Sequence, residues 1–341
     1  MLHLTPARRR AAFIWSRRIR NGFLTTLAVA ALLLAVLALI ARTQLIANVP
    51  SLVLAAGAPY GSLAALVGLV IAASCRRYVL SIFAAVVLLT TLAVQISWYY
   101  IEHPSEVSAY QEIRVLSSNL RYGLADPLFL VRLATESADA ITVSELTPEA
   151  VQRFEQAGID KTFPYSHLLP GPGPGGIGMW SRYPLTPLTV PRQAGVKMRA
   201  ARMLIPGVRF DPLLASVHII SPVAGDANTV AEWRGGMAGA KMQLENFARN
   251  VGPAAVIIGG DYNSTPDMRQ FRDLLTNGYD DAVDEAGAGF APTFPSNTWY
   301  PPLITIDHVL TRNATASSIK TIEIPGSDHR ALLVTVRIPD Q

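Results

Sequence analysis

The sequence of 341 residues has one cysteine and almost no acidic residues in its N-terminal third. Because Cys75 stands alone, an intrachain disulfide is excluded, and the redox compartment stays open. Residues 22–100 contain neither Asp nor Glu, and every acid except Glu102 lies beyond residue 104. A stretch of this length, dominated by Ala, Leu, Val and Ile, is typical of membrane-spanning segments.

The net charge of +4 is the sum of two parts with opposite signs. Residues before 105 carry nine Lys and Arg and one acid, a net of +8, whereas the rest carry 20 Lys and Arg against 24 acids, a net of −4. The basic overall charge therefore reports membrane topology. It does not indicate a nucleic-acid-binding protein, since the expected soluble domain is acidic.

Three apolar segments are each long enough to cross a bilayer core of about 30 Å: residues 22–41, 52–74 and 79–98. A cleaved signal peptide is the competing interpretation of the first, but its apolar run is longer than the usual ~7–15 residues and two more spans follow. Basic residues precede the first segment and lie between the second and third as Arg76-Arg77. The positive-inside rule then predicts a multi-pass protein of the cell membrane with a cytoplasmic N-terminus and an extracytoplasmic C-terminal part.

We divide the chain into a basic cytoplasmic tail (1–21), three transmembrane helices (22–100), a linker (101–112) and an extracytoplasmic domain (113–341). In that domain, short apolar runs alternate with amphipathic stretches. The expected strands are 113–118, 139–144, 177–181, 213–218, 254–260, 304–311 and 331–338. The expected helices are 127–137, 148–157, 228–249 and 266–275. Many strands with few, scattered helices predict a layered α/β sandwich instead of a regular βαβ array.

The stretch 257–266, with the sequence IIGGDYNSTP, is the most informative in this domain. Its apolar start predicts a buried strand, and the two glycines allow a tight turn. Because residues two apart on an extended segment point to the same side, Asp261 and Asn263 are expected to converge at the end of the strand. A polar strand-to-helix turn without chemistry is the competing interpretation.

Other predicted strands also deliver polar side chains to their ends: Asn119, Glu145, His218, the pair Asp307-His308, and Ser327-Asp328-His329 just before the last strand. Metal-dependent phosphoryl transfer needs such a set. It requires hard oxygen ligands for Mg²⁺, a positioned base for water, and donors for the charge on the non-bridging oxygens.

In order and spacing, these segments resemble the endonuclease/exonuclease/phosphatase superfamily, which includes DNase I-like nucleases, sphingomyelinases and inositol-phosphate 5-phosphatases. Residues 260–263 correspond to its Gly-Asp-Phe/Leu-Asn, residues 327–329 to its terminal Ser-Asp-His, and residues 178–185 to its strand ending in Ser-Arg-Tyr-Pro. The resemblance covers residues 113–338. It implies a DNase I-like four-layered α/β sandwich, here preceded by three transmembrane helices, and a Mg²⁺ cofactor with Mn²⁺ as the alternative.

The resemblance implies roles for the oxygen-bearing residues. Glu145 would be the main metal ligand, with Asn119 beside it at the metal or its water shell. Asp261 would orient or deprotonate the attacking water, and Asn263 would hold a phosphate oxygen. Leu120-Arg121 follows Asn119 where nucleases often have Asn or Asp, which argues against a nuclease-type contact from that loop.

The histidines are assigned in the same way. His329 would contact the scissile phosphate, with Asp328 either fixing its tautomer or lying near the metal. His218 would be a second phosphate-contacting or acid-catalytic histidine, although a structural hydrogen bond is the alternative. Asp307 would support one of the two histidines or simply cap a turn. His308 points to the opposite face of its strand from Asp307 and is left out.

His167, beside the loop Pro170–Gly176, is expected at the surface, with a contact to the substrate as the alternative. Four basic residues could bind an anionic head group, but a solvated edge strand is the preferred interpretation: Lys197, Arg199, Arg202 and Arg209.

The layout narrows the expected substrate. A linker of about a dozen residues keeps the site within tens of ångströms of the outer leaflet, and a domain of net charge −4 is poorly suited to a polyanionic duplex. Three spans also exceed what anchoring requires. We therefore expect a phosphohydrolase whose partners are membrane lipids and a membrane-embedded phosphoryl or pyrophosphoryl substrate. The layout resembles that of the VanJ-type teicoplanin-resistance membrane proteins, and this resemblance implies a lipid-linked diphosphate such as undecaprenyl diphosphate as the substrate.

Two alternatives stay open. The first is a membrane-tethered nuclease or phosphodiesterase acting on nucleic acid or phospholipid head groups, although no basic run with interleaved aromatic residues is present. The second is a catalytically inactive binding or scaffolding domain. It predicts a missing core residue, whereas all the matched residues are there.

Overall fold

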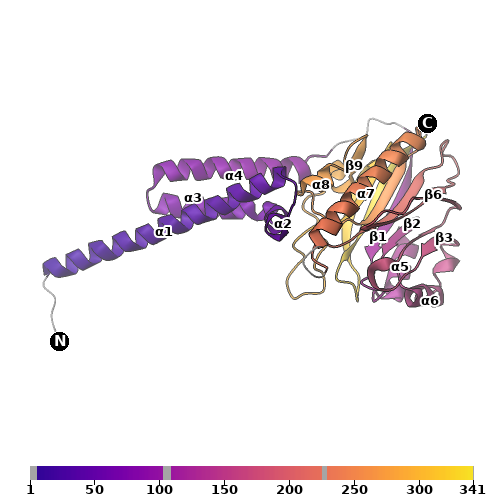
Figure 1. The fold of residues 1–341 in the computed structure, drawn as a ribbon, viewed down its shortest axis with the longest axis horizontal. Helices are drawn as coiled ribbons and strands as arrows, with labels where there is room; N and C mark the ends of the chain where they lie inside the picture. Colours follow the sequence, from indigo (N-terminus) through magenta and orange to yellow (C-terminus); the bar gives the residue numbers. More distant parts are fainter. Residues whose placement is uncertain (1–5, 103–108, 225–228, 341) are drawn as a thin grey trace.

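The computed structural model describes residues 6–102, 109–224 and 229–340. Apolar helices extend from one side of a globular α/β domain (Figure 1): α1 Pro6–Thr43, α2 Val49–Ala56, α3 Gly61–Ser74 and α4 Tyr78–Tyr99. Parts of the expected tail (1–5) and linker (103–108) lie outside the described residues. Most of the tail that is described belongs to α1, so the basic segment continues the first apolar helix.

Helices α1, α3 and α4 lie side by side (Figure 1) around a small core that includes Leu32, Ala65 and Val87. Residues 17–43 and helix α4 are each long and apolar enough to cross a membrane. The expected second span is not a single helix: α2 and α3 form a pair bent by 53°, which brings the candidate spans to three if it is counted as one. Pro59 lies at the break, where its missing N–H interrupts the helix.

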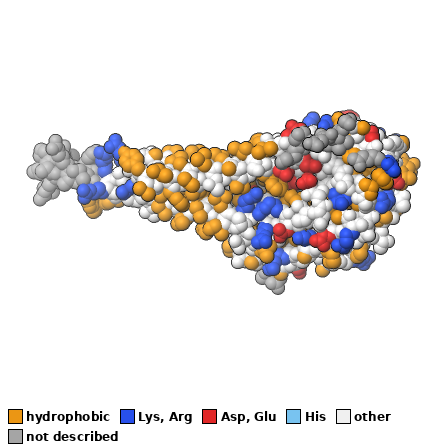
Figure 2. All heavy atoms as spheres, turned by 90° about the horizontal axis from the view of Figure 1, so that it is seen from above, with side chains coloured by type: hydrophobic (Ala, Val, Ile, Leu, Met, Phe, Trp, Pro, Cys, Tyr) orange, Lys and Arg blue, Asp and Glu red, His pale blue; other side chains and the backbone are white. Residues whose placement is uncertain are grey.

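The surface of the helices is apolar along their length. Figure 2 shows hydrophobic side chains covering them and basic side chains at the end remote from the globular domain. The Arg77 Nε–H donates to Thr25 Oγ1 at 3.4 Å, so the turn between α3 and α4 lies against the N-terminal part of α1. Both basic clusters of the helical part therefore lie towards the same end.

The globular domain contains two six-stranded sheets. The first has the order β11 (Thr315–Glu323), β12 (Arg330–Pro339), β1 (Tyr110–Asn119), β2 (Ala140–Ser144), β4 (Ile177–Ser181), β3 (Tyr165–Leu169). The second has the order β5 (Leu185–Leu188), β6 (Val196–Met203), β7 (Leu213–Ile219), β8 (Val256–Asp261), β10 (Asp307–Arg312), β9 (Tyr279–Asp281). The pairs β1/β2 and β7/β8 are parallel, so their carboxyl ends share one edge of each sheet.

Helices pack on the outer faces. Helices α5 (Pro127–Ser137) and α6 (Pro148–Gln156) share a core with the first sheet, and α7 (Thr229–Asn250) and α8 (Arg269–Arg272) share one with the second. The short helix α9 (Ala282–Ala286) follows β9. Apolar residues from both sheets, such as Val115 and Ile257, fill the layer between them. The predicted four-layered α/β sandwich is confirmed.

Several predicted elements need correction. The helix expected over 266–275 is regular only over Arg269–Arg272. Of the basic residues, Lys197, Arg199 and Arg202 lie on β6, between β5 and β7, so the edge-strand interpretation is wrong for them. Arg209 lies outside the strand. The residues of β6 alternate, because Val196, Met198 and Ala200 are buried while Lys197 is exposed and Arg199 half-buried. An edge strand shows the same alternation of apolar and polar residues, so the sequence did not distinguish the two positions in the sheet.

The helical part is docked on the globular domain at the end of α1. Ala41, Ile46 and Leu52 belong to the same core as Met268 and Phe271. Arg42 forms a buried ion pair with Asp267. Gln270 exchanges two hydrogen bonds of 3.2 Å with the backbone of Ile46. The helices thus contact the segment that follows Asp261 and Asn263.

Candidate active site

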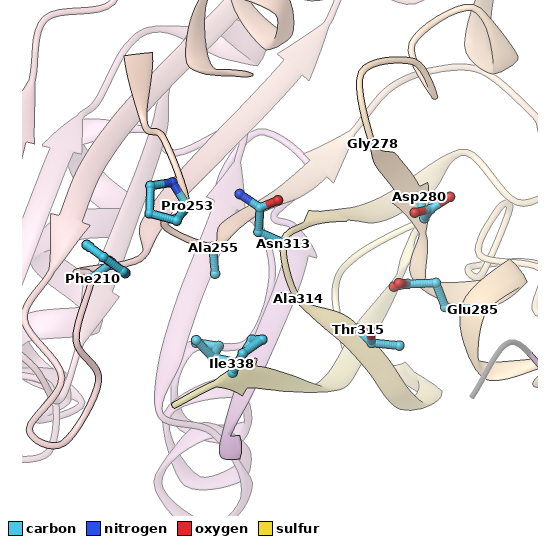
Figure 3. Close-up of a pocket in the computed structure, with 11 residues that line it drawn as sticks. Phe210, Pro253, Ala255, Gly278, Asp280, Glu285, Asn313, Ala314, Thr315 and Ile338 are labelled. Carbon is cyan, nitrogen blue, oxygen red and sulfur yellow. The ribbon is translucent and has the colours of Figure 1, made fainter. Parts of the chain in front are cut away.

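Two cavities lie at opposite ends of β8 and β10. One, of about 350 Å³, is at the end where β10 finishes, with Glu285 and Asp280 on one side and Phe210 and Ile338 on the other (Figure 3). The second is a cleft of about 560 Å³ at the end where β8 finishes and β10 begins, and it contains most of the predicted site residues. The cleft is the candidate active site.

Strand register brings the predicted residues to this edge. Asn119 pairs with Ser144, the residue before Glu145, and His218 pairs with Asp261 across the parallel strands β7 and β8. Asp261 pairs in turn with Asp307 across the antiparallel strands β8 and β10. Six predicted residues line the cleft directly: Glu145, His218, Asp261, Asn263, Asp328 and His329. Asn119 and Asp307 contact them from behind.

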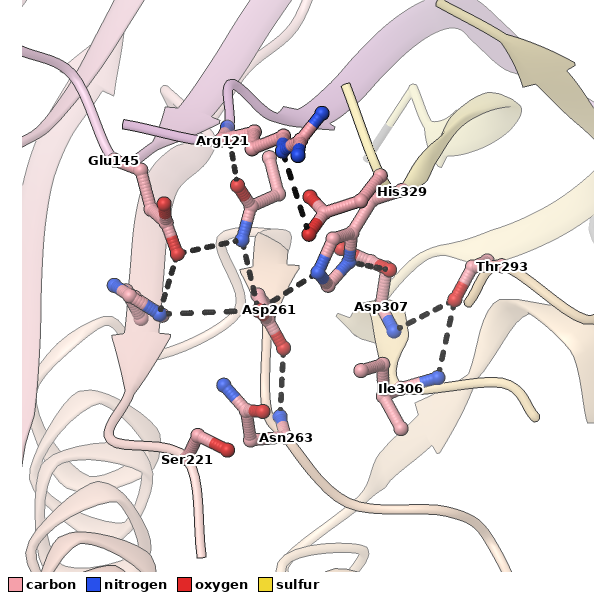
Figure 4. Close-up of polar contacts among 12 residues, drawn as sticks. Arg121, Glu145, Ser221, Asp261, Asn263, Thr293, Ile306, Asp307 and His329 are labelled. Carbon is pink, nitrogen blue, oxygen red and sulfur yellow. Dashed lines mark hydrogen bonds and ion pairs between the residues drawn. The ribbon is translucent and has the colours of Figure 1, made fainter. Parts of the chain in front are cut away.

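One amide joins the two main carboxylates of the cleft (Figure 4). The Asn119 Nδ2 donates to Glu145 Oε1 at 3.2 Å and to Asp261 Oδ2 at 2.9 Å. Glu145 Oε2 accepts from the Tyr122 N–H at 2.7 Å. The Asn119 oxygen, the atom that would bind a cation, accepts instead from the Arg121 N–H at 2.8 Å. In this arrangement Asn119 orients the two carboxylates.

The donor set fits a divalent cation. Glu145 and Asp261 present hard carboxylate oxygens to the same part of the cleft, which is the chemistry that Mg²⁺ prefers. A second group of possible ligand atoms, from Asp261, Asp307 and His329, lies within 4.8 Å of one another. In that group Asp307 is already bound to the His329 ring, so Glu145 and Asp261 remain the better pair.

Asp261 is buried at the centre of the site. Burial raises its pKa to about 6, while the positive charge of His329 acts in the opposite direction. Its Oδ1 accepts from the Asn263 N–H at 2.8 Å, and Asn263, with φ of 47°, turns the chain beyond the strand. A Cβ on Gly260 would lie 1.9 Å from Val217 O, so only glycine allows β8 to approach β7 this closely.

His329 is held by Asp307. Its Nδ1 lies 2.8 Å from Asp307 Oδ2, and its Nε2 faces Asp261 Oδ2 at 3.9 Å. Burial lowers the pKa of His329, but Asp307 and Asp261 outweigh it and raise the pKa to about 10. The ring is therefore protonated at neutral pH. Asp328 does not bind the ring nitrogen; its carboxylate lies 3.8 Å from Arg121 Nε.

His218 faces the same carboxylates from β7. Its Nδ1 lies 3.0 Å from the Pro174 carbonyl, which can only accept, so Nδ1 carries a proton. Its Nε2 then points to Glu145 Oε1 and Asp261 Oδ2, at 3.8 Å from each. The Pro/Gly loop that contains Pro174 was expected only as a loop, and its contact with His218 was not predicted.

Other predictions resolve more simply. His308 lies on the face of β10 opposite Asp307, as predicted; there it is buried in the core and both of its ring nitrogens have partners. His167 is half-buried on β3 and does not line the cleft. Sequence analysis did not identify Phe294, whose ring lies 4.9 Å from that of His329, or Tyr122, which also lines the cleft.

The most consequential residues that sequence analysis missed form an apolar wall. Leu52, Val53 and Ala56 of α2 line the same cleft as the polar residues. Four more apolar residues of the lining come from the globular domain: Ile220, Val223, Met268 and Ile304. The cleft is thus lined by both polar and apolar residues, and part of this apolar wall comes from the bent helix pair.

Comparison with known proteins agrees with this fold. A model of the Endonuclease/Exonuclease/phosphatase family matches residues 116–329, more than half of the chain. A humanized D. rerio TDP2 has a similar structure, with 17% identity and a TM-score of 0.53 over 66% of this chain and 98% of that chain. An endonuclease/exonuclease/phosphatase from Bacteroides vulgatus has 15% identity and a TM-score of 0.51 over 67% of this chain and 99% of its own. None of the curated proteins matches the chain significantly.

Proposed function

Because the chain belongs to the endonuclease/exonuclease/phosphatase family, we propose that it is a membrane-anchored hydrolase of a lipid-linked diphosphate, such as undecaprenyl diphosphate. The observation that carries the proposal is the mixed lining of the cleft. Its polar residues suit a phosphate group, and its apolar residues include Leu52, Val53 and Ala56 of the membrane helices. An amphiphile with a charged head and an apolar chain matches both kinds of lining residue.

The part of the apolar wall that comes from α2 is positioned by a shared hydrophobic core and by an ion pair with the globular domain. Leu52 is buried in the core that α2 shares with the globular domain, whereas Val53 is 63% exposed. The ion pair of Arg42 with Asp267 fixes the end of α1, from which α2 follows after a short turn. A lipid tail lying along Val53 would bury apolar surface at about 25 cal/mol per Å².

The proposed orientation puts the cleft on the outer face of the membrane. Arg17, Arg18 and Arg20 on α1, and Arg76-Arg77 at the turn before α4, lie towards the end of the bundle remote from the cleft. The positive-inside rule assigns that end to the cytoplasm. A phosphohydrolase of this orientation would act on lipid carriers exposed on the outer leaflet.

The residues of the cleft support hydrolysis by a positioned water. Asp261 accepts the proton of the attacking water, and the protonated His329 donates from Nε2 to a non-bridging phosphate oxygen. A bond forms from the water oxygen to phosphorus as the bridging P–O bond breaks, and the electron pair leaves with the departing phosphate. Mg²⁺ held by Glu145 would supply positive charge for the phosphate oxygens.

The first test uses the full-length protein in detergent with Mg²⁺. We expect phosphate release from undecaprenyl diphosphate, lost with EDTA and in Asp261→Asn, and retained in Asp160→Asn, a surface control. Nicking of plasmid DNA is measured in parallel. Nicking without phosphate release would make the protein a tethered nuclease.

A second test addresses the apolar wall. Val53→Glu should lower hydrolysis of undecaprenyl diphosphate far more than that of isopentenyl diphosphate, which has the same head group on a single isoprene unit. Val49→Glu is the matched control, because Val49 is exposed on the same helix but does not line the cleft. Equal losses for both substrates in Val53→Glu would remove the tail-binding role of α2.

A further inference from the structure

A loop beside the cleft exposes an aromatic tip. Residues 295–303, called the Trp299 loop below, connect Phe294 to Ile304, and both of these residues line the cleft. Trp299 is 96% exposed, and its ring makes an edge contact of 5.5 Å with that of Tyr300. Leu303, at the end of the loop, is also exposed. Single exposed aliphatic residues are ordinary, but a Trp almost wholly in water gives up the burial of a large apolar ring.

The loop is attached to the membrane helices. The Tyr60 O–H donates to the Leu303 carbonyl at 2.6 Å. Tyr60 lies in the break between α2 and α3, and its ring also contacts that of Phe290 edge-on at 6.3 Å. Gln95 of α4 donates to the Pro59 carbonyl at 2.5 Å. The base of the Trp299 loop is thus held where helix α4 and the bent pair of α2 and α3 meet the globular domain.

The same loop is attached to the catalytic residues. The Ser296 N–H donates to the Asp328 carbonyl at 2.7 Å, and the Phe294 ring packs on that of His329. The Leu303 N–H closes the base by donating to Phe294 O at 2.9 Å. A displacement of the loop would therefore act on Asp328 and His329 through short, direct contacts.

We propose that the Trp299 loop inserts its tip into the head-group region of the membrane that the helices cross, and so holds the cleft against the lipid surface. The occupant of the exposed tip is the bilayer, because the helix break that binds Leu303 continues directly into apolar helix α3. Trp and Tyr favour this depth, since the ring is apolar and the N–H or O–H remains hydrated. The exposed Val53 of α2 lies on the same cleft as the base of the loop.

The location of the tip can be measured without any assay of hydrolysis. In a Cys75→Ala background, which removes the single cysteine, Trp299→Cys is labelled with a fluorophore and the full-length protein is reconstituted into phosphatidylcholine/phosphatidylglycerol vesicles. We expect brominated lipids to quench this label and aqueous iodide to quench it weakly. Arg209→Cys, an exposed residue beside Phe210 of the remote cavity, is the control and should show the reverse.

Hydrolysis supplies a second readout, and this inference rests on the proposed function only there. Trp299→Ala should slow hydrolysis of undecaprenyl diphosphate in vesicles on the order of tenfold and leave that of isopentenyl diphosphate unchanged. Quenching by lipid without any hydrolysis would uphold the loop and overturn the proposed substrate. Quenching by iodide with full hydrolysis would overturn the membrane insertion of the loop but not the proposed substrate. A label shielded from both quenchers would also overturn the insertion, because it would indicate that the tip contacts protein.

Discussion

Strand β10 contributes a residue to each of two histidine–aspartate pairs, one on each face of the strand. On the cleft face, Asp307 binds Nδ1 of His329 at 2.8 Å. On the core face, His308 binds Asp281 through Nδ1 at 2.6 Å. The pairs differ at the other ring nitrogen. The Nε2 of His308 lies 2.9 Å from the Ser264 carbonyl, whereas the Nε2 of His329 faces the cleft.

Both histidines contact an aspartate, so this contact alone does not identify a catalytic residue. The difference is whether the second ring nitrogen is free to bind a substrate. His308 is fully buried against the Phe271 ring at 4.1 Å and has no atom left for a substrate. His329 keeps one donor for a phosphate oxygen. Substitutions in the two pairs should therefore separate activity from stability.

The largest effect is expected for His329→Gln. The variant removes the charged donor that faces Asp261, so the rate of hydrolysis should fall by about 10³-fold. Because the buried Asp307 also loses its cationic partner, some stability is lost as well, so the rate is expressed per folded molecule. Rates at saturating substrate are compared with those of wild-type protein. A rate within tenfold of wild type would remove His329 from the chemistry.

Asp281→Asn tests the core pair. The substitution leaves the buried His308 without its anionic partner and should destabilise the fold by about 3 kcal/mol. The rate of hydrolysis per folded molecule should stay at the wild-type value, because neither residue lines the cleft. Thermal unfolding in detergent and active-site titration give the two quantities. A loss of rate with unchanged stability would contradict the structural role.

Asp307→Asn tests how His329 is positioned. The amide can still reach Nδ1 but no longer favours the protonated ring, so we expect the rate to fall by about 10²-fold, as for other carboxylates behind a functional histidine. The pKa of His329, followed by NMR of its ring, should fall, because Asp307 is the main cause that raises it. An unchanged ring pKa would show that Asp261 alone holds the proton.

The sequence was sufficient to predict the polar residues at the strand ends that line the cleft, but not the contacts between them. Apolar runs that end in polar residues predicted where Asn119, Glu145, His218 and Asp261 lie, because parallel strands deliver their ends to one edge. Asp307 was predicted to support one of the two histidines, and it does, but the sequence could not decide that this histidine is His329, because the two meet only through the pairing of β10 with β8 across a long connection. Asp328, the neighbour of His329 in sequence, was an equally good candidate.

The apolar wall could not be predicted from the sequence, for a different reason. It depends on the bend at Pro59 and on the docking of α1 through Arg42 and Asp267, which are 225 residues apart. The misassigned edge strand has a local cause. Its true outer neighbour, β5, is only four residues long and contains Pro187, so it leaves little pattern to detect.

The far end of β10 supplies the smallest predicted effect. Thr311 Oγ1 and the Ala316 N–H both donate to Glu285 Oε2, at 2.7 and 2.8 Å, beside the remote cavity. Burial raises the pKa of Glu285 from 4.5 to about 7, and the two hydrogen bonds oppose it. The folded protein thus binds a proton more tightly than the unfolded chain. The stability that this gives is fully present below pH ~4.5 and is lost as the pH rises through 7.

Between pH 5 and pH 8 this loss amounts to roughly 2–3 kcal/mol. Glu285→Gln keeps an oxygen that can accept both hydrogen bonds but cannot ionise. The variant should therefore gain stability relative to wild type as the pH rises, while its rate of hydrolysis stays the same at the other end of the strand. Thermal unfolding of both proteins at pH 5 and pH 8 measures the difference. If the two profiles run parallel, Glu285 is already ionised in the folded protein, and the hydrogen bonds from Thr311 and Ala316 outweigh its burial.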